Sequence, residues 1–465
     1  GGDSILTIQV VSRAKKRGLL LAPRHIFQNQ TIAELARVAD ASALAAESGS
    51  GAGPVPLTPG QTLLLAGAPE GVLGWNDAVL AELPQGVGAE AVEKSLAALA
   101  ARHDALRLRF ERREDGSWTQ RIAAPSEVSP LALGRIGAGE VAAARERFDL
   151  AAGPLQAFLV EPDRLLLAAH PLAVDAASWP LLLEDLAAAA EGRELPAATA
   201  SFRRFAEALE SSPGVAEARQ TAGAGRLPVD LRGGEAANTE GSARTLPVTV
   251  PAEESRALLA EGTRRYGNTV EELLLAALTK AVSGWTGAPR LAVDLAGSPR
   301  EGVFEELDGS RTVGCLTWTS PLHLENEADE GALLKEVKET VRRLPRRGLG
   351  SRLPVPEVGS RFQAGAAGPW KAELLAPVRP AMAARRHVLD VSGFLAGESL
   401  RVDFLYSEAL HRPETVRRLA DRFLESLGAI IRHCQSSDAG GFTPSDFPEA
   451  GLSQEDLDDL LADLA

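Results

Sequence analysis

Apolar residues recur at two spacings along the chain, and each spacing predicts a different element. A stripe formed by Val92, Leu96 and Leu99 predicts a helix over 89–102. Similar spacing predicts helices over 179–190, 270–285, 332–343 and 413–434, and a short amphipathic helix over 452–465. Alternating positions or short apolar runs predict strands over 105–110, 165–169, 291–295, 387–392 and 400–406. Helices and strands follow a similar order in both halves, which predicts a mixed α/β architecture with two similar lobes.

Three stretches interrupt this periodicity. Residues 41–59 are rich in Ala, Ser and Gly and then in Pro, which is the composition of a flexible linker. Residues 221–241 and 359–384 are rich in Gly and Ala, and the latter stretch has weak periodicity. The unit before the first break has about 40 residues, which is too few for a self-sufficient core.

Composition and charge exclude several classes of protein. The 49 Lys and Arg against 63 Asp and Glu give a net charge of −14, which argues against a nucleic-acid groove. No apolar run approaches the roughly 20 residues that span a bilayer, so no membrane partner is expected. The two cysteines, Cys315 and Cys434, are far apart, and the seven histidines lack paired metal-ligand spacing. These features, with the absence of a signal-peptide pattern, predict a cytoplasmic protein without a metal site, and the start at Gly1 fits a piece of a longer chain.

The first residues carry a candidate attachment site. Ser4 stands in Gly-Gly-Asp-Ser-Ile before a helical stretch, a position where a serine by itself is ordinarily an N-cap. With the later His25-Ile26-Phe27 and 31–35, the segment resembles the back part of a thiolation (peptidyl carrier) domain of a nonribosomal peptide synthetase. That resemblance implies a covalent 4′-phosphopantetheine on Ser4, whose phosphodiester would rest at a helix N-terminus. Asp3 before the serine resembles carriers that precede epimerization domains.

The remainder resembles the condensation-domain superfamily of these synthetases. The resemblance lies in the order of several motifs, among them Val55-Pro56-Leu57-Thr58-Pro59-Gly60-Gln61 and Arg102-His103-Asp104-Ala105-Leu106-Arg107. Taken alone, His103 near a helix end and Arg107 in an alternating run are typical of structural residues. The stretches 308–314, 317–321 and 440–448 resemble the epimerization subtype in particular.

The active-site motif of the superfamily departs from its pattern at one position. The family has His-His-x-x-x-Asp, and this chain has His170, Pro171 and Asp175 in that frame. The resemblance implies that Pro171 stands where the family has an acid/base histidine, and proline has no titratable group. His170 is the surviving first histidine, usually structural in the family, and Asp175 is expected to hold the loop through a buried charge pair.

A second departure affects the opposing proton-transfer group. Epimerization domains carry Glu-Gly-His-Gly-Arg-Glu, and the matching residues here run from Ala296 through Ser298 to Arg300 and Glu301. The resemblance therefore implies that Ala296 replaces the second acid/base, while Arg300 stays as a structural arginine. Asp294 would share the strand face of Ala296, so a displaced base is an alternative.

Three hypotheses follow. The first is a carrier followed by an epimerization-type domain that is expected to have lost L-to-D epimerase activity and serves as a docking or recruitment platform. The second is an active epimerase or altered thioester enzyme that uses Asp294, Ser298, Glu301 or His170. The third is a structural spacer that touches no substrate. The expected partners are a carrier-bound aminoacyl or peptidyl thioester, neighbouring synthetase modules and a recruited tailoring enzyme.

The resemblance also implies the fold. We expect an α/β protein with two chloramphenicol-acetyltransferase-like lobes in a V, preceded by a partial all-α carrier helical bundle. The expected units are the carrier over 1–40, the linker over 41–59, the first lobe over 60–231, the second lobe over 241–450 and an acidic helix over 451–465.

Overall fold

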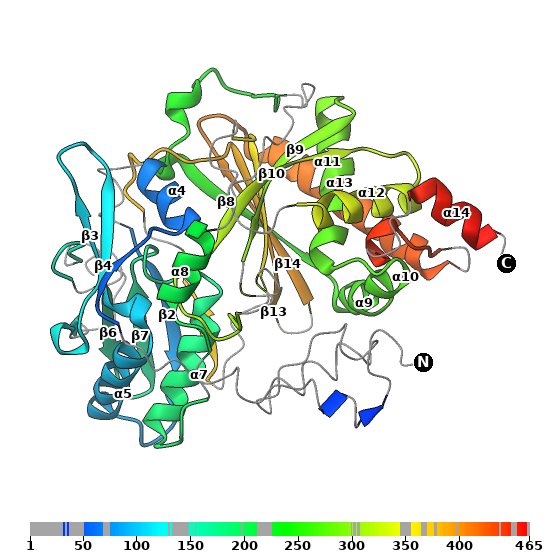
Figure 1. The fold of residues 1–465 in the computed structure, drawn as a ribbon. Coiled ribbons are helices and arrows are strands. Elements are labelled where there is room, and N and C mark those ends of the chain that lie inside the picture. The colour runs from blue at the N-terminus through cyan, green and yellow to red at the C-terminus, as the bar shows by residue number, and fades with distance from the viewer. Residues whose placement is uncertain are drawn as a thin grey trace.

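The computed structural model describes residues 31, 32, 35 and 36 and most of 51–462. Within the latter range it leaves out 68–74, 129–130, 133–147, 154, 197–198, 212–225, 299, 301–303, 305–306, 345–354, 364–369, 376–378, 397–398, 437–438 and 448–452. The predicted carrier, with Asp3 and Ser4, therefore lies outside the described residues. What is described forms two α/β lobes side by side (Figure 1).

The first lobe contains two sheets and the helices that cover them. Its helices are α4 (Pro59–Gly67), α5 (Ala89–Arg102), α7 (Ser178–Ala190) and α8 (Phe202–Ser211). Its strands are β1 (Gly53–Val55), β2 (Asp77–Glu82), β3 (Leu108–Arg112), β4 (Trp118–Ile122), β5 (Leu131–Ala132), β6 (Gln156–Val160) and β7 (Arg164–Ala169). β1 pairs with β4, so the lobe begins inside the stretch predicted as linker. The strand order is β1-β4-β3 in one sheet and β12-β2-β7-β6-β5 in the other.

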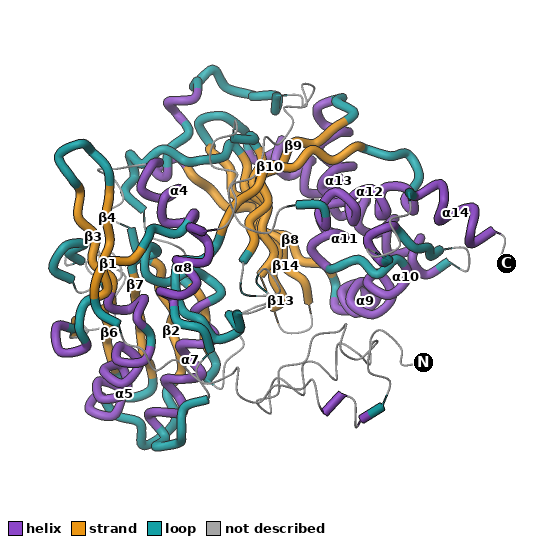
Figure 2. Tube along the Cα trace, viewed as in Figure 1, coloured by secondary structure: helices purple, strands orange, loops and turns teal. Residues whose placement is uncertain are grey.

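The second lobe is built on one sheet with the order β10-β9-β11-β13-β14-β8. These strands are β8 (Ala243–Val250), β9 (Arg290–Gly297), β10 (Trp318–Glu325), β11 (Val358–Gln363), β13 (Leu389–Ala396) and β14 (Ser399–Ser407). Its helices are α9 (Ala252–Ala257), α10 (Thr263–Arg265), α11 (Val270–Thr286), α12 (Glu330–Arg342), α13 (Pro413–Gln435) and α14 (Gln454–Ala462). The long helices α11, α12 and α13 gather on the side of this sheet that faces away from the first lobe (Figure 2).

Local sequence explains where these helices begin and end. Thr269 and Glu272 form a reciprocal capping box at the start of α11, and Gly287 ends that helix with a φ of 74°. Asp329 accepts a hydrogen bond from the backbone N–H of Ala332 at the start of α12. Pro413 occupies the first turn of α13, where its missing N–H costs nothing.

The predicted strand over 105–110 is partly wrong. Asp104–Arg107 form a short 3-10 turn, and the strand β3 begins only at Leu108. The alternation is typical of a half-exposed strand, yet Arg107 is completely buried. Its guanidinium donates to the carbonyl oxygens of Ala100 and Ala101 at the end of α5 and of Ala123 after β4. Arg107 therefore satisfies carbonyl groups at a helix C-terminus instead of facing water.

The two lobes share chain as well as surface. The short strand β12 (Ala372–Leu374) comes after most of the second lobe, yet it pairs with β2 of the first. Residues 307–317, which we call the crossing segment, also contribute Val313 and Leu316 to the buried core of the first lobe. Both β11 and β12 fall in the stretch 358–384, where the sequence had indicated only weak periodicity. The second lobe has its own core, to which Leu278, Val293 and Phe404 belong.

Candidate functional site

The chain leaves β7 through a tight turn that holds the motif starting at His170. The backbone N–H groups of Ala173 and Val174 both donate to the carbonyl of His170, at 2.9 and 3.2 Å. The His170 side chain is fully buried, and its Nδ1 accepts a hydrogen bond from the N–H of Leu172 at 3.2 Å. One imidazole nitrogen is therefore already engaged, and the ring lies away from solvent. Pro171 follows, also buried, with neither a proton to give nor a base to accept one.

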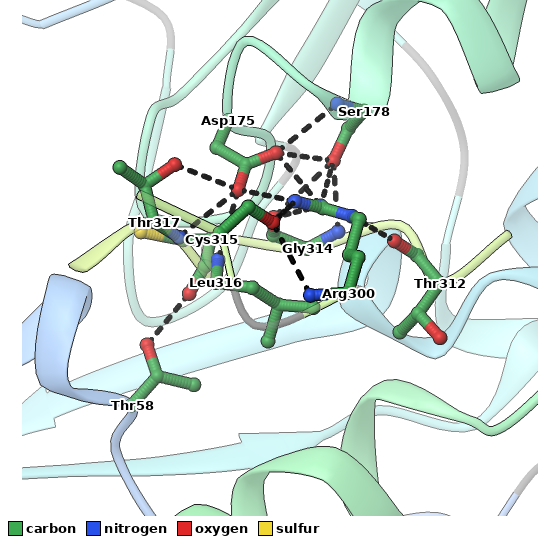
Figure 3. A network of polar contacts seen from close by, with 10 residues as sticks. Thr58, Asp175, Ser178, Arg300, Thr312, Gly314, Cys315, Leu316 and Thr317 are labelled. Atoms are coloured by element: carbon green, nitrogen blue, oxygen red, sulfur yellow. Dashed lines mark hydrogen bonds and ion pairs between the residues drawn. The ribbon is translucent and has the colours of Figure 1, made fainter. Parts of the chain in front are cut away.

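Asp175 ends this turn and lies at the centre of a dense polar network (Figure 3). Its two carboxylate oxygens accept from Arg300 Nη2 and Nη1 at 2.8 and 2.9 Å. Further donors are the backbone N–H groups of Leu316 and Thr317 at 3.1 Å and the Thr317 hydroxyl at 3.0 Å. Ser178, at the start of α7, donates from its hydroxyl at 2.7 Å. One carboxylate of the first lobe thus binds an arginine and a strand approach of the second.

Arg300 uses its whole guanidinium group in the same network. Besides Asp175, it donates from Nε to the carbonyl of Thr312 at 2.8 Å and from Nη2 to that of Gly314 at 3.0 Å. Its side chain is 6% exposed, as is that of Asp175. Gly314 allows this approach because it has a φ of 157° and because a Cβ would lie 2.3 Å from the Phe202 ring. The buried charge pair expected for Asp175 is therefore present, with Arg300 as its partner.

Electrostatics keep this pair ionised. Burial alone would raise the pKa of Asp175, but the Arg300 charge and the hydrogen bonds from Arg300 and Ser178 outweigh it and hold the pKa below its usual value. A carboxylate that accepts this many hydrogen bonds is a poor proton acceptor at neutral pH. Asp175 and Arg300 together form what we call the lobe joint, which stabilises the arrangement of the two lobes.

The second departure from the family motif lies on β9. Ala296 stands opposite Thr319 of β10 and offers no titratable group. Asp294, two residues earlier on the same face, is 1% exposed, and its Oδ2 accepts from Arg386 at 2.8 and 3.0 Å. Its Oδ1 is buried and has no hydrogen-bond partner among the described residues. Burial would raise the pKa of Asp294, but the hydrogen bond from His387 and the charge of Arg386 lower it overall, so the carboxylate is ionised.

His387 connects Asp294 to a second carboxylate across the sheet. Its Nε2 lies 3.1 Å from Asp294 and its Nδ1 lies 2.6 Å from Asp390. Gly359 of β11 lies between these two aspartates in register, and a Cβ there would come within 2.4 Å of the His387 ring. Burial lowers the pKa of His387, but the two carboxylates raise it more. We call Asp294, His387 and Asp390 the imidazole bridge.

Sequence reasoning missed the imidazole bridge, although two signals were available. Gly359 interrupts a strand at a position where a side chain would ordinarily add stability, and His387 precedes Asp390 at the start of another strand. Neither signal specifies a partner, because the contact depends on the order of three strands.

The remaining candidates have structural contacts or lie outside the described residues. The hydroxyl of Ser298 accepts from Arg300 Nη1 at 3.0 Å. Glu301 is outside the described residues. In the second motif, His103 Nε2 contacts Asp185 of α7 at 2.8 Å, and Asp185 also pairs with Arg311 of the crossing segment. His103 therefore contributes to the packing of α7, in agreement with a structural role.

Other chemistry finds no support near the lobe joint. Cys315 is buried beside it, and burial, with the nearby Asp175 charge, raises the pKa of its thiol far above neutrality. Among the described residues, no group of His, Cys, Asp and Glu side chains could hold a metal ion. Over the same residues, no helix combines the length and the apolarity needed to cross a bilayer.

Comparison with known proteins agrees with this architecture. The family model described as condensation domain matches residues 52–351. A linear gramicidin synthase protein of Brevibacillus parabrevis is 37% identical over 99% of this chain, and the chain spans only 7% of that relative. The epimerization domain from the third module of tyrocidine synthetase B has a TM-score of 0.72 and 25% identity, covering 84% of this chain and 98% of that one. The X-domain from teicoplanin biosynthesis, in a complex with OxyB, has a TM-score of 0.58 and 20% identity, covering 82% and 93%.

Proposed function

Because the chain belongs to the condensation-domain family of nonribosomal peptide synthetases, we propose that it is an epimerization-type member with a degenerate proton-transfer centre. In this proposal the domain receives a carrier-bound aminoacyl or peptidyl thioester and serves as a docking or recruitment platform, with little or no epimerization of its own. The observation that carries the proposal is the pair Pro171 and Ala296 beside an intact lobe joint.

The epimerization subtype is supported from two sides. The stretches 308–314 and 440–448 resemble that subtype, and the likeness to the tyrocidine synthetase epimerization domain covers nearly all of that domain. The segments also have clear structural duties here. Arg311 of the first stretch pairs with Asp185, and Asp446 of the second pairs with the buried Lys338 of α12 at 2.6 Å.

The loss of activity is supported by the chemistry of inversion. Inverting an α-carbon requires removal of a proton from one face and delivery to the other, so two titratable groups are needed. Pro171 and Ala296 supply none, and Asp294, Ser298 and His170 are each already bound to other protein groups. Since each acid/base group contributes roughly 10²–10⁴ in rate, loss of both would leave little activity.

The platform role is supported by what the chain retains. A docking surface that spans two lobes requires both lobes to stay in a fixed arrangement. Asp175 and Arg300 provide this through their mutual hydrogen bonds and their contacts to the crossing segment. The same fold occurs in the teicoplanin X-domain, whose complex with OxyB is an example of this architecture binding another protein.

The carrier belongs to the same proposal. Residues 1–40 would form part of a thiolation domain, and Ser4 would carry 4′-phosphopantetheine, with Asp3 beside it. The arm supplies a thiol that holds the substrate as a thioester. Ser4 contributes the hydroxyl oxygen that the phosphodiester needs, at the N-terminal end of the helix predicted to follow.

An α-proton exchange assay tests the proposal. An L-aminoacyl pantetheine is attached to Ser4 in the chain with a complete carrier, and deuterium uptake at the α-carbon is followed in deuterated water together with chiral analysis. We expect exchange equal to that of a chain in which Ser4→Ala prevents loading and the same thioester is supplied free. Exchange at least tenfold above this control would overturn the proposal.

The second candidate function is active epimerization, favoured by the 25% identity with an epimerization domain and by the imidazole bridge, which reaches β9 two residues from Ala296. In this case a proton would pass through His387 in place of the family residues. Exchange above the control that disappears in His387→Gln would establish this function.

A further inference from the structure

The first residues of the first lobe are held by one side chain, Arg203 of α8. Its Nη2 donates to the carbonyl of Gly51 at 2.6 Å and to that of Gly53 at 3.3 Å, and its Nη1 donates to that of Pro54 at 2.6 Å. All three acceptors are backbone carbonyls within four residues at the end of the predicted linker. A planar guanidinium with several fixed donors suits this task better than an ammonium group.

Arg203 starts from a rigid base. The backbone N–H groups of Phe202 and Arg203 both donate to the carboxylate of Asp104, at 3.1 and 3.2 Å, which satisfies the N-terminus of α8. Phe202 and Phe205 on the same helix are fully buried. The helix therefore cannot turn without disturbing the core, and the guanidinium has a fixed origin.

The segment held by Arg203 is shaped to be held. Gly53 has a φ of 123°, which a residue with a side chain rarely adopts, and a Cβ at Gly51 would lie 3.4 Å from the Arg203 Nε. Gly53, Pro54 and Val55 pair with β4 as the strand β1. The chain is thus fixed from Gly51 onward by contacts that involve its backbone and not its side chains.

We propose that Arg203 is a positioning residue that fixes the point and direction in which the tether to the carrier leaves the first lobe. The inference rests on the proposed carrier over residues 1–40, and it adds the residue that governs how the carrier is presented. With the tether held at Gly51, its free length is residues 41–50.

The size of the effect follows from tether length. If the hold on Gly51–Pro54 were lost and the chain detached as far as Leu57, the free tether would lengthen from about 10 to about 17 residues. For a flexible chain the root-mean-square span would rise from about 17 to about 23 Å. The effective concentration of the arm would then fall about twofold, since it varies as roughly the −3/2 power of length, and further because direction is also lost.

Two readouts test this in the chain with a complete carrier. Spin labels at Ser48→Cys and Glu93→Cys report the distribution of distances between the tether and α5; both native cysteines are buried and do not compete for label. Separately, a bromoacetyl-pantetheine arm on Ser4 alkylates the thiol of an Ala296→Cys variant, and this rate is divided by the rate with free bromoacetyl-pantetheine. Arg203→Ala is the test variant and Arg203→Lys the conservative one.

Arg193→Ala is the matched control. Arg193 is an arginine of the same lobe that pairs with Glu191 at 2.8 Å, and none of the hydrogen bonds that hold Gly51–Pro54 in the described part of the chain comes from it. We expect Arg203→Ala to broaden the distance distribution and lower the normalised alkylation rate at least twofold. Arg203→Lys should give intermediate values and Arg193→Ala parental ones. If Arg203→Ala does not fold, Arg203→Gln replaces it.

An unchanged distance distribution in Arg203→Ala overturns the inference, as does a broadened distribution with an unchanged alkylation rate. If the arm alkylates Ala296→Cys in no variant, including the one with native Arg203, delivery from this carrier is refuted and the proposed function fails. The distance distribution still decides separately whether Arg203 holds the tether.

Discussion

Replacing Asp175 by asparagine removes the negative charge from the lobe joint while keeping the size of the side chain. The buried Arg300 then faces a neutral amide, and the new NH₂ group is directed at donors that previously met a carboxylate oxygen. Removing one partner of a buried ion pair costs about 3–5 kcal/mol, so we expect Asp175→Asn to lower the free energy of unfolding by about that amount.

The measurement is urea unfolding of the parent, Asp175→Asn, Arg300→Met and the double variant. Because Asp175 and Arg300 come from different lobes, we expect the double variant to be less destabilised than the sum of the singles, with a coupling energy above about 1 kcal/mol. The single variants should also separate the unfolding of the two lobes into distinct transitions. Singles that lose less than about 1 kcal/mol with no coupling would refute the idea that this pair joins the lobes.

The pH dependence follows with a definite sign. The folded-state pKa of Asp175 lies below its unfolded value of about 3.9, so its contribution is complete above that value and is lost as pH falls through the folded pKa. On acidification from neutral pH to below about pH 4, Asp175→Asn should therefore lose less stability than the parent. Parallel curves for the two proteins would contradict this role of the carboxylate.

Three further predictions concern the proton-transfer centre and the imidazole bridge. The double substitution Pro171→His with Ala296→Glu should raise α-proton exchange at least about 10²-fold over the parent in the loaded-carrier assay, and no gain would show that more than these two groups is missing. Gly359→Ala should destabilise the second lobe by about 1–3 kcal/mol in urea unfolding, because its Cβ would overlap the His387 ring, and an unchanged midpoint would mean that the ring moves aside at no cost. Since the pKa of His387 is raised in the folded state, its contribution is present below the unfolded value of about 6.5 and declines as pH rises through the folded value; His387→Gln should abolish this decline in unfolding midpoints measured across pH, and an equal decline in both proteins would count against it.

Helix positions were largely predictable from the chain. The predicted helix over 89–102 has the observed bounds of α5, and α11 and α13 differ from prediction by one residue at the C-terminal end. These helices have long apolar stripes and local start signals, so their limits depend on neighbours in sequence.

Buried polar residues account for most of what could not be predicted. Arg107, Arg300 and His387 are of types that are usually exposed or half-exposed, yet each is buried because partners elsewhere in the chain satisfy it. The expected charge pair of Asp175 came from family resemblance, whereas its distances and its seven hydrogen-bond donor atoms required the structure. The same applies to β12, since three residues carry too little pattern to reveal that they join the sheet of another lobe.

The pairing of β12 with β2 has a consequence for synthesis on the ribosome. β2 ends at Glu82 and β12 begins at Ala372, so about 290 residues separate them. At roughly 5–20 residues per second, the hydrogen-bonding edge of β2 stays uncovered for about 15–60 s after it emerges. An open edge strand is a site for wrong pairing with another chain. The first lobe is therefore expected to need protection by chaperones during translation, and fragments that stop before Ala372 should aggregate.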